Sequence, residues 1–161
     1  MKPVFAVLAL AALVIGGVVS RADAAPACAD DRVQLRWPGG EAEFRVELAV
    51  DEVSRRRGLM YRDALPRFGG MLFVYPAPHR ARFWMENTRI PLDMLFFDAG
   101  GTLKSLHRSA EPFSRKSIDG GDGVQFVLEI NGGLSDILGI VTGGELRHPM
   151  IPQETADWPC K

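Results

Sequence analysis

The stretch GGMLFVYPAPHRARFWMENTRIPLDMLFF, residues 69–97, decides how this chain folds. Its apolar residues come in short runs separated by proline, asparagine and charged side chains, which is typical of strands joined by turns. We expect strands at residues 71–75, 82–85 and 93–97. The polar residues within the stretch could form a site, or could serve only as turns between buried strands.

The same pattern of short strands continues on both sides of this stretch. Residues 43–50 alternate apolar and polar side chains, as expected for a strand with one face in solvent, and Pro38-Gly39-Gly40 predicts a hairpin that joins them to residues 33–37. Asp51 is placed to cap a short helix that ends at Gly58. We expect further strands at 102–107, 124–130 and 145–147, and a second short helix at 132–140.

Together these elements predict a mainly β or α+β domain. About seven or eight short strands with two short helices fit a barrel-like, largely antiparallel sheet, which covers its own edges. We expect one globular domain over residues 33–148, preceded by an N-terminal segment at 25–32 and followed by a C-terminal surface tail at 149–161. The glycine-rich residues 117–123 predict a mobile loop that could form a lid over the barrel mouth.

The first residues of the chain predict where the protein is sent. Lys2 precedes an apolar run at residues 4–19, and Ala22-Asp23-Ala24 is a small-residue cleavage pattern. Residues 1–24 are therefore typical of a secretory signal peptide. We expect an exported protein, periplasmic or extracellular, with no stable membrane span after cleavage.

Charge and motifs argue against several classes of function. Without Lys2, Arg21 and Asp23, the 19 basic and 20 acidic side chains fall to 17 and 19, a net charge of −2 that has little attraction for nucleic acid. The three arginines at residues 55–57 are more typical of a solvated helix end than of an anion site. The patterns GxGxxG, GxxxxGK[ST] and GxSxG are absent. We therefore expect no cofactor and no nucleic-acid partner.

The two cysteines, Cys28 and Cys160, lie near the two ends of the mature chain and outside the predicted strands. An exported context permits them to form a disulfide. Alternatively, Cys28 could carry a lipid, although Ala25 stands three positions before it in place of the usual leucine. The spacing of the two cysteines suits neither a redox pair nor a zinc site, so we predict a disulfide that ties the termini together.

Four blocks of sequence resemble a known family. The strings RGLMYRDALPRFGGMLFVY, FWMENTRIPLDMLFFDAGG, VLEINGG and GIVTGG occur in the order found in domain-of-unknown-function family 192, a bacterial and archaeal group that is often exported. The resemblance spans residues 33–147, and it implies no particular reaction, substrate or cofactor. One departure is Glu86, which follows FWM where the family more often has a basic residue. This difference makes a shared anionic ligand less plausible.

Polar residues within the core-like strands are candidates for a binding site. Asp93 lies on an apolar strand and must find partners, either an arginine (Arg62 first and Arg89 second) or a set of backbone amides. With Trp84 as a wall, such fixed polar groups would have the composition of a small-ligand pocket. The candidate residues are Arg62, Trp84, Asn87, Thr88 and Asp93, of which Asn87 and Thr88 are also typical turn residues.

Two other chemistries stay open at this point. Asp93 and Glu129 could form the acid/base pair of a hydrolase that acts on a glycan or cell-wall component, if their strands bring the carboxyls into one cleft. His79, Met85 and Met94 could instead hold Cu(I), since imidazole and thioether ligands suit that ion. Our main hypothesis is a small-ligand or envelope-partner binding module, with the hydrolase and a periplasmic Cu(I) carrier as alternatives.

Overall fold

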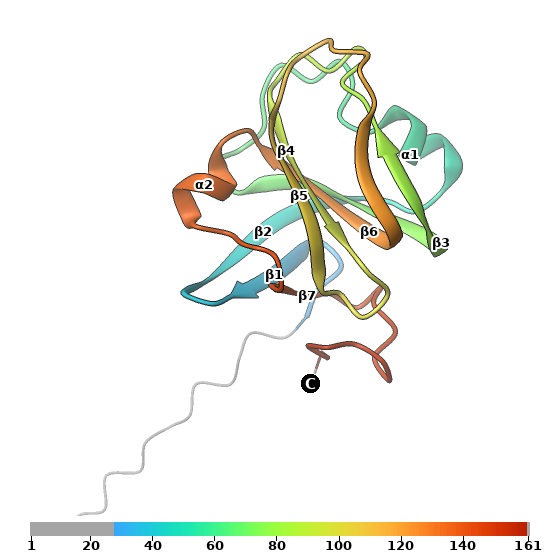
Figure 1. Ribbon diagram of the computed structural model, residues 1–161, viewed down its shortest axis with the longest axis vertical. Coiled ribbons are helices and arrows are strands. Elements are labelled where there is room, and N and C mark those ends of the chain that lie inside the picture. The colour runs from blue at the N-terminus through green and yellow to red at the C-terminus, as the bar shows by residue number, and fades with distance from the viewer. Residues whose placement is uncertain (1–27, 161) are drawn as a thin grey trace, which may run out of the picture.

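Seven strands and two short helices make up the computed structural model, which describes residues 28–160 (Figure 1). The predicted signal peptide at 1–24 lies outside these residues. The strands are β1 (Arg32–Trp37), β2 (Gly40–Ala49), β3 (Gly69–Phe83), β4 (Leu92–Phe97), β5 (Leu103–Ala110), β6 (Ile118–Asn131) and β7 (Glu145–Arg147). The helices are α1 (Glu52–Arg57) and α2 (Leu134–Leu138). None of the described helices is long and apolar enough to cross a membrane.

All seven described strands belong to one curled sheet with the order β5-β4-β6-β3-β2-β1-β7. Neighbouring strands pair antiparallel, except that β2 and β3 run parallel. The curl brings the two edge strands together, because Thr102 before β5 bridges Glu145 of β7, and the amide of Leu103 donates to the carbonyl of Gly144 at 2.7 Å. The predicted mainly β, barrel-like and largely antiparallel sheet is confirmed as a half-barrel whose edges partly cover each other.

The long antiparallel pair of β3 and β6 differs from the sequence-based prediction in two ways. The strands expected at 71–75 and 82–85 are one strand, because β6 pairs with both halves across an irregular register. Residues 117–123, expected as a mobile lid, instead lead into and form the start of β6. Glycine and aspartate are poor strand formers, so this segment gave no strand signal. Backbone pairing with β3 and the ion pair between Arg80 and Asp119 hold it in place.

The two faces of the sheet bury different apolar clusters. Because successive residues of a strand point to opposite faces, Met71 and Leu72 belong to different clusters, as do Phe96 and Phe97. Every residue of β4 is buried, which places this strand at the centre of the core. Helix α2 packs with one cluster through Leu134.

Helix α1 begins and ends as the sequence predicts. The Asp51 carboxylate accepts hydrogen bonds from the amides of Val53 at 2.8 Å and Ser54 at 2.9 Å, so the predicted cap is confirmed. The helix ends at Gly58, whose φ of 48° favours glycine. A Cβ atom at Gly58 would lie 3.2 Å from the ring of Phe73, so the end of α1 sits directly against β3.

The two ends of the described chain are joined. Cys28 and Cys160 form the predicted disulfide with a Cα to Cα distance of 5.7 Å, so the Cys28 thiol is not free to carry a lipid. Just before this bridge, the ring of Trp158 is approached by the guanidinium groups of Arg36 at 4.6 Å and Arg147 at 5.4 Å. Cation–π contacts and the disulfide therefore fix the C-terminal segment against β1 and β7.

We expect the double variant Cys28→Ser, Cys160→Ser to lose about 4 to 5 kcal/mol of unfolding free energy, because the disulfide closes a long loop and so reduces the conformational entropy of the unfolded chain. The bridged residues are 132 positions apart. Urea denaturation of the protein from residue 25 onward measures the loss, and chemically reduced wild type is the matched control. A variant that unfolds at the same urea concentration as the oxidised protein would contradict this role.

Candidate functional site

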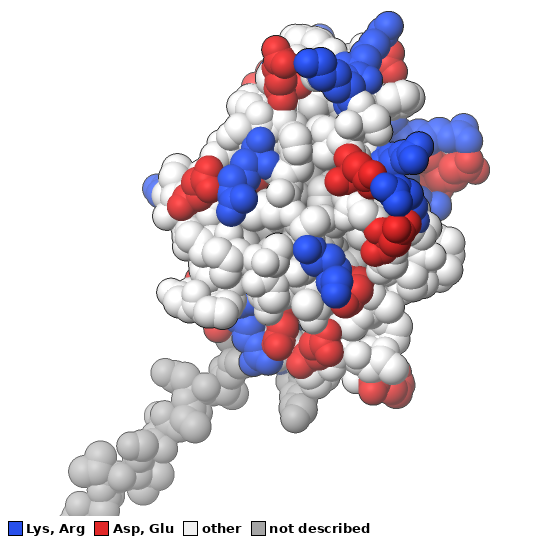
Figure 2. Space-filling model, viewed as in Figure 1, with Lys and Arg blue, Asp and Glu red and all other residues white. Residues whose placement is uncertain are grey.

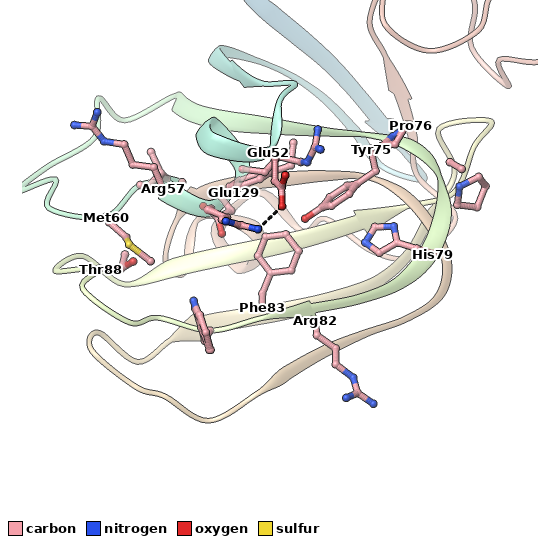
Figure 3. Close-up of a pocket in the computed structure, with 18 residues that line it drawn as sticks. Glu52, Arg57, Met60, Tyr75, Pro76, His79, Arg82, Phe83, Thr88 and Glu129 are labelled. Carbon is pink, nitrogen blue, oxygen red and sulfur yellow. Dashed lines mark hydrogen bonds and ion pairs between the residues drawn. The ribbon is translucent and has the colours of Figure 1, made fainter.

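A pocket of about 760 Å³ opens where α1 meets β3 and β6 (Figure 3). Its lining comes from α1 and the turn that follows, from β3 and the loop after it, and from one residue of β6. This volume lies within the range of small-molecule sites. The close approach of Gly58 to Phe73 determines how the helix end and the sheet enclose it.

Four aromatic side chains contribute to the walls of the pocket. Phe73 and Tyr75 lie two positions apart on β3 and therefore share a face of the sheet, while Phe83 and Trp84 come from the end of the same strand and the next residue. Phe73 and Phe83 pack edge to face with ring centroids 5.3 Å apart. Trp84 is 55% exposed, so it stands at the mouth rather than in the core.

One buried carboxyl group lies in this pocket, besides the exposed carboxylate of Glu52 at its edge. Glu129 is 4% exposed, and its neighbours across the sheet are Met71 on β3 and Met94 on β4. Among the described residues, no hydrogen bond or ion pair reaches its carboxyl. Burial in these surroundings raises the pKa of Glu129 from 4.5 to about 8. At neutral pH the pocket therefore contains an uncharged carboxylic acid.

Tyr75 and His79 bring two more polar groups to the same space. Their rings lie 4.0 Å apart between centroids, and Figure 3 shows the Tyr75 hydroxyl and the Glu129 carboxyl directed toward the same part of the pocket. Burial raises the pKa of the Tyr75 hydroxyl, and the charge of Arg55 partly opposes that rise. His79 Nδ1 is buried without a hydrogen-bond partner in the described part of the chain. The pocket thus gathers three groups that a ligand could satisfy.

Arg55 supports the wall of the pocket rather than its interior. Its guanidinium donates to the carbonyl groups of Val50 at 2.6 Å and Val74 at 3.0 Å. The same group lies 5.1 Å from the centroid of the Tyr75 ring. Arg55 therefore holds the helix end to β3 and fixes the tyrosine.

The remaining arginines of the lining lie at the rim. Arg56 pairs with Glu52 on the exposed surface of α1. Figure 3 shows the side chains of Arg57 and Arg82 directed away from the centre of the pocket. Arg56 and Arg57 are exposed, as expected for a solvated helix end.

Two of the predicted binding residues line this pocket, and a third, Asn87, lies in the turn between β3 and β4. Trp84 and Thr88 are part of the lining. Asn87 has a φ of 57° and its carbonyl accepts a hydrogen bond from the amide of Tyr61 at 2.9 Å. Asn87 therefore has the turn role that its residue type suggests.

Asp93 lies elsewhere and has a structural environment. It is fully buried, and its carboxylate accepts hydrogen bonds from the amides of Ser109 at 2.7 Å, Gly133 at 2.9 Å and Ser135 at 2.8 Å. The partners are thus backbone amides, the second of the two possibilities raised by the sequence. Through them Asp93 joins β4 to β5 and to the start of α2.

Arg62 and Arg89, the arginines considered as partners of Asp93, pair with other residues. Arg62 donates to Glu47 at 2.6 Å and Arg89 donates to Asp63 at 2.6 Å. Arg62 lines a separate hollow of about 350 Å³ on the other side of α1's end. The structure therefore does not bring Arg62 and Asp93 together with Trp84.

The register of β4 against β6 also separates the two carboxyls proposed as an acid/base pair. Asp93 stands opposite Ile130, whereas Met94 stands opposite Glu129. Residues opposite each other share a face, so Asp93 and Glu129 point to opposite faces of the sheet. They do not form a common cleft.

The alternative Cu(I) ligands are divided as well. His79 lines the pocket, but Met85 and Met94 are fully buried in an apolar cluster and are not part of the lining. The described residues contain no group of three histidine, cysteine, aspartate or glutamate side chains that could hold a metal ion. Both methionines fill core volume instead.

Sequence reasoning missed Phe73, Tyr75 and Phe83 as pocket residues. Their runs have the appearance of core strands, and only the position of α1 shows which of their faces stays accessible. The alternation along 71–75, which places Phe73 and Tyr75 on one face with Met71, is the signal that could have indicated a shared wall.

With this geometry established, the chain can be compared with known proteins. The sequence model of DUF192, a family described as Uncharacterized ACR, COG1430, matches residues 34–148. The chain belongs to this family. No curated protein matches the chain.

Two solved structures are similar to this DUF192 protein. One is a candidate transcription regulator of Sinorhizobium meliloti 1021, with 40% identity and a TM-score of 0.70, over 76% of this chain and 96% of the other. The second is a protein of unknown function from Novosphingobium aromaticivorans DSM 12444, with 35% identity and a TM-score of 0.70, over 77% of this chain and 93% of the other. Both support the same fold.

Replacing Asp93 with asparagine should cost about 3 kcal/mol of unfolding free energy, because the amide group turns a donor toward backbone amides that need an acceptor. Denaturation in urea measures the loss. The control is Asp63→Asn, since Asp63 is 80% exposed, and we expect no measurable change there. Equal stability of the two variants would refute the structural role of Asp93.

Glu129 should make the protein less stable as the pH rises. Its folded pKa of about 8 lies above the unfolded value of 4.5, so the unfolded chain loses this proton first, and the free energy of the unfolded state falls relative to that of the folded state between those pH values. The unfolding free energy of wild type should fall relative to Glu129→Gln across this window, by up to about 5 kcal/mol. Denaturation of both proteins from pH 4 to pH 9 tests this, and parallel pH profiles would refute it.

Proposed function

We propose that this protein is an exported module that binds a small ligand in the pocket that contains Glu129. The observation that carries the proposal is a buried carboxyl without a protein partner inside an accessible, aromatic-walled pocket. Burying a polar group without a hydrogen bond costs free energy, and a ligand that supplies the partner recovers that cost.

The composition of the pocket supports a small ligand over a protein partner. Tyr75, Phe83 and Trp84 offer apolar area, while Glu129 and His79 offer a few fixed polar groups. This combination is the usual one for a small-molecule site. The candidate groups lie inside a concavity, where the projecting side chains of a protein partner would have to enter deeply to reach them.

Binding is also favoured over catalysis. The second carboxylate of the lining, Glu52, lies on the exposed surface of α1 and pairs with Arg56, while Asp93 faces the other side of the sheet. The pocket therefore lacks a free pair of acids for the hydrolase chemistry considered above.

Export is supported by the leader pattern in the sequence and by the disulfide between Cys28 and Cys160. Structural disulfides form in oxidising compartments, such as the periplasm and the extracellular space. A role at nucleic acid, which one relative's description would suggest, gains no support from the charges. On the face shown in Figure 2, acidic and basic side chains are interspersed rather than gathered by sign.

A thermal-shift screen of the mature, disulfide-bonded protein tests the proposal, with amines, amino acids, sugars and cell-wall fragments as compounds. A compound at 100 times its dissociation constant should stabilise the protein by about 2.7 kcal/mol, which is a shift of several degrees. The shift should disappear in Trp84→Ala and persist in Ile137→Ala, a control at a 74% exposed apolar residue on α2. A shift that survives in Trp84→Ala, or no shift with any compound, would count against this pocket as the site.

A further inference from the structure

The inside of the pocket differs in charge from its rim. Arg55 is held by backbone carbonyls and Arg56 is paired with Glu52, while Figure 3 shows Arg57 and Arg82 directed away from the centre of the pocket. Inside lie the faces and edges of aromatic rings and the carboxyl of Glu129. The interior therefore offers a potential negative charge surrounded by the electron-rich faces of aromatic rings.

Aromatic faces and a buried carboxylate both attract cations. A ring face attracts an ammonium group through its quadrupole, and the attraction grows when the cation is taken out of water. A buried carboxylate needs a positive partner, because its charge is costly in apolar surroundings. Trp84 and Phe83 can supply the faces, because the Tyr75 ring already contacts the Arg55 guanidinium and the His79 ring, and Glu129 can supply the charge.

We propose that the pocket binds organic ammonium ions, with the cation held against the aromatic rings and ion-paired to the ionised carboxylate of Glu129. The proposal rests on the proposed function, since it names the class of ligand for the same site. It explains why a carboxyl without a protein partner is kept in a core position: its partner arrives with the ligand.

An anionic ligand fits these contacts less well. An anion inside the pocket would face the carboxyl of Glu129, and the arginines of the lining either have partners already, as Arg55 and Arg56 do, or are directed outward, as Figure 3 shows for Arg57 and Arg82. The rim arginines Arg57 and Arg82 oppose a cation only from the mouth, where solvent and salt screen their charges. A neutral ligand could bond to the uncharged acid, and the experiment below separates that case.

Binding of a cation should release the proton of Glu129. The other titratable and charged groups of the lining come from α1 and β3, because the neighbour of Glu129 on β4 is Met94, which does not titrate. They are Glu52, Arg55, Arg56, Arg57, Tyr75, His79 and Arg82, of which Arg57 and Arg82 are directed away from the pocket. The variant His79→Gln is the control for the imidazole group.

The experiment is isothermal titration calorimetry on the mature, disulfide-bonded protein with choline and its uncharged carbon analogue 3,3-dimethylbutan-1-ol. The two probes have the same shape and differ in charge. Titrations at pH 7 in buffers of different ionisation enthalpy give the number of protons released. A series from pH 6 to pH 9 gives the pH dependence of the affinity.

We expect choline to bind at least tenfold more tightly than the alcohol at pH 8 and to release about one proton at pH 7. If only the ionised carboxylate binds, the affinity should rise by up to roughly ninetyfold between pH 6 and pH 9. Glu129→Gln should lower the affinity for choline at least tenfold and abolish the proton release. His79→Gln removes a polar group of the lining and can change the affinity itself, but it should keep both the proton release and the rise of the affinity with pH.

The aromatic contribution has its own matched pair of variants. Trp84→Leu keeps an apolar side chain at the mouth but removes the ring face, and should weaken choline binding severalfold while leaving the alcohol nearly unchanged. Phe113→Leu is the control, since Phe113 is exposed and not part of the lining. Equal loss in both variants would overturn the role of the ring.

Three results would overturn the proposal as a whole. These are an alcohol that binds as tightly as choline, choline binding without proton release, and no binding of choline at any pH. If the alcohol binds as tightly as choline, the pocket is still a small-ligand site, but for a different chemical class. The same holds if choline does not bind while another compound of the thermal-shift screen binds at Trp84. If every compound fails in both experiments, the proposed function fails as well.

Discussion

The register between β3 and β6 is the constraint on which the rest of the structure depends. It sets Glu129 opposite Met71, and through β6 it sets Met94 of β4 on the same face. A slip of one residue would turn Glu129 to the other face and expose its apolar neighbours. The same pairing carries Tyr75 and His79 to the pocket and holds the glycine-rich beginning of β6, so fold and site follow from a single alignment of two strands.

The buried carboxyl of the pocket lowers the folding stability of the protein. An uncharged acid in apolar surroundings could be replaced by a hydrophobic side chain with no loss of packing, yet the chain keeps Glu129 there. Backbone strain gathers in the neighbouring loops, where Tyr61, Asn87 and Phe113 all have positive φ angles. The amide of Tyr61 donates to the carbonyl of Asn87, and the amide of Phe113 donates to that of Thr88, so these strained positions form one connected group that reaches the lining. Strain and desolvation thus occur together at one place in the molecule.

Much of the fold could be predicted from local patterns. Alternation along 43–50 and the cap at Asp51 are properties of neighbouring residues. The structure confirms the cap, and it confirms the alternation as far as Leu48, whereas Ala49, expected on the solvent face, is buried and Val50 is exposed. The start of β6 could not be predicted, because pairing with a distant strand overrides the preferences of its glycines. The candidate site was predicted only in part. Trp84 lines the pocket, as expected of an aromatic wall, and so does Thr88. The separation of Asp93 from Glu129 depends instead on the register between strands, which the sequence of a single strand does not reveal.

The place of β1 in the sheet has a consequence for how the chain is made. β1 is among the first elements to be synthesised, but its outer neighbour, β7, is the last strand, and the disulfide that follows uses Cys160. Until β7 has left the ribosome, one side of β1 has no partner, and an unpaired edge can join the strands of other chains. The sheet can therefore be completed only after β7 has been made. For a protein that crosses a membrane before it folds, such a delay would keep the chain extended during transport and let the half-barrel close on the far side.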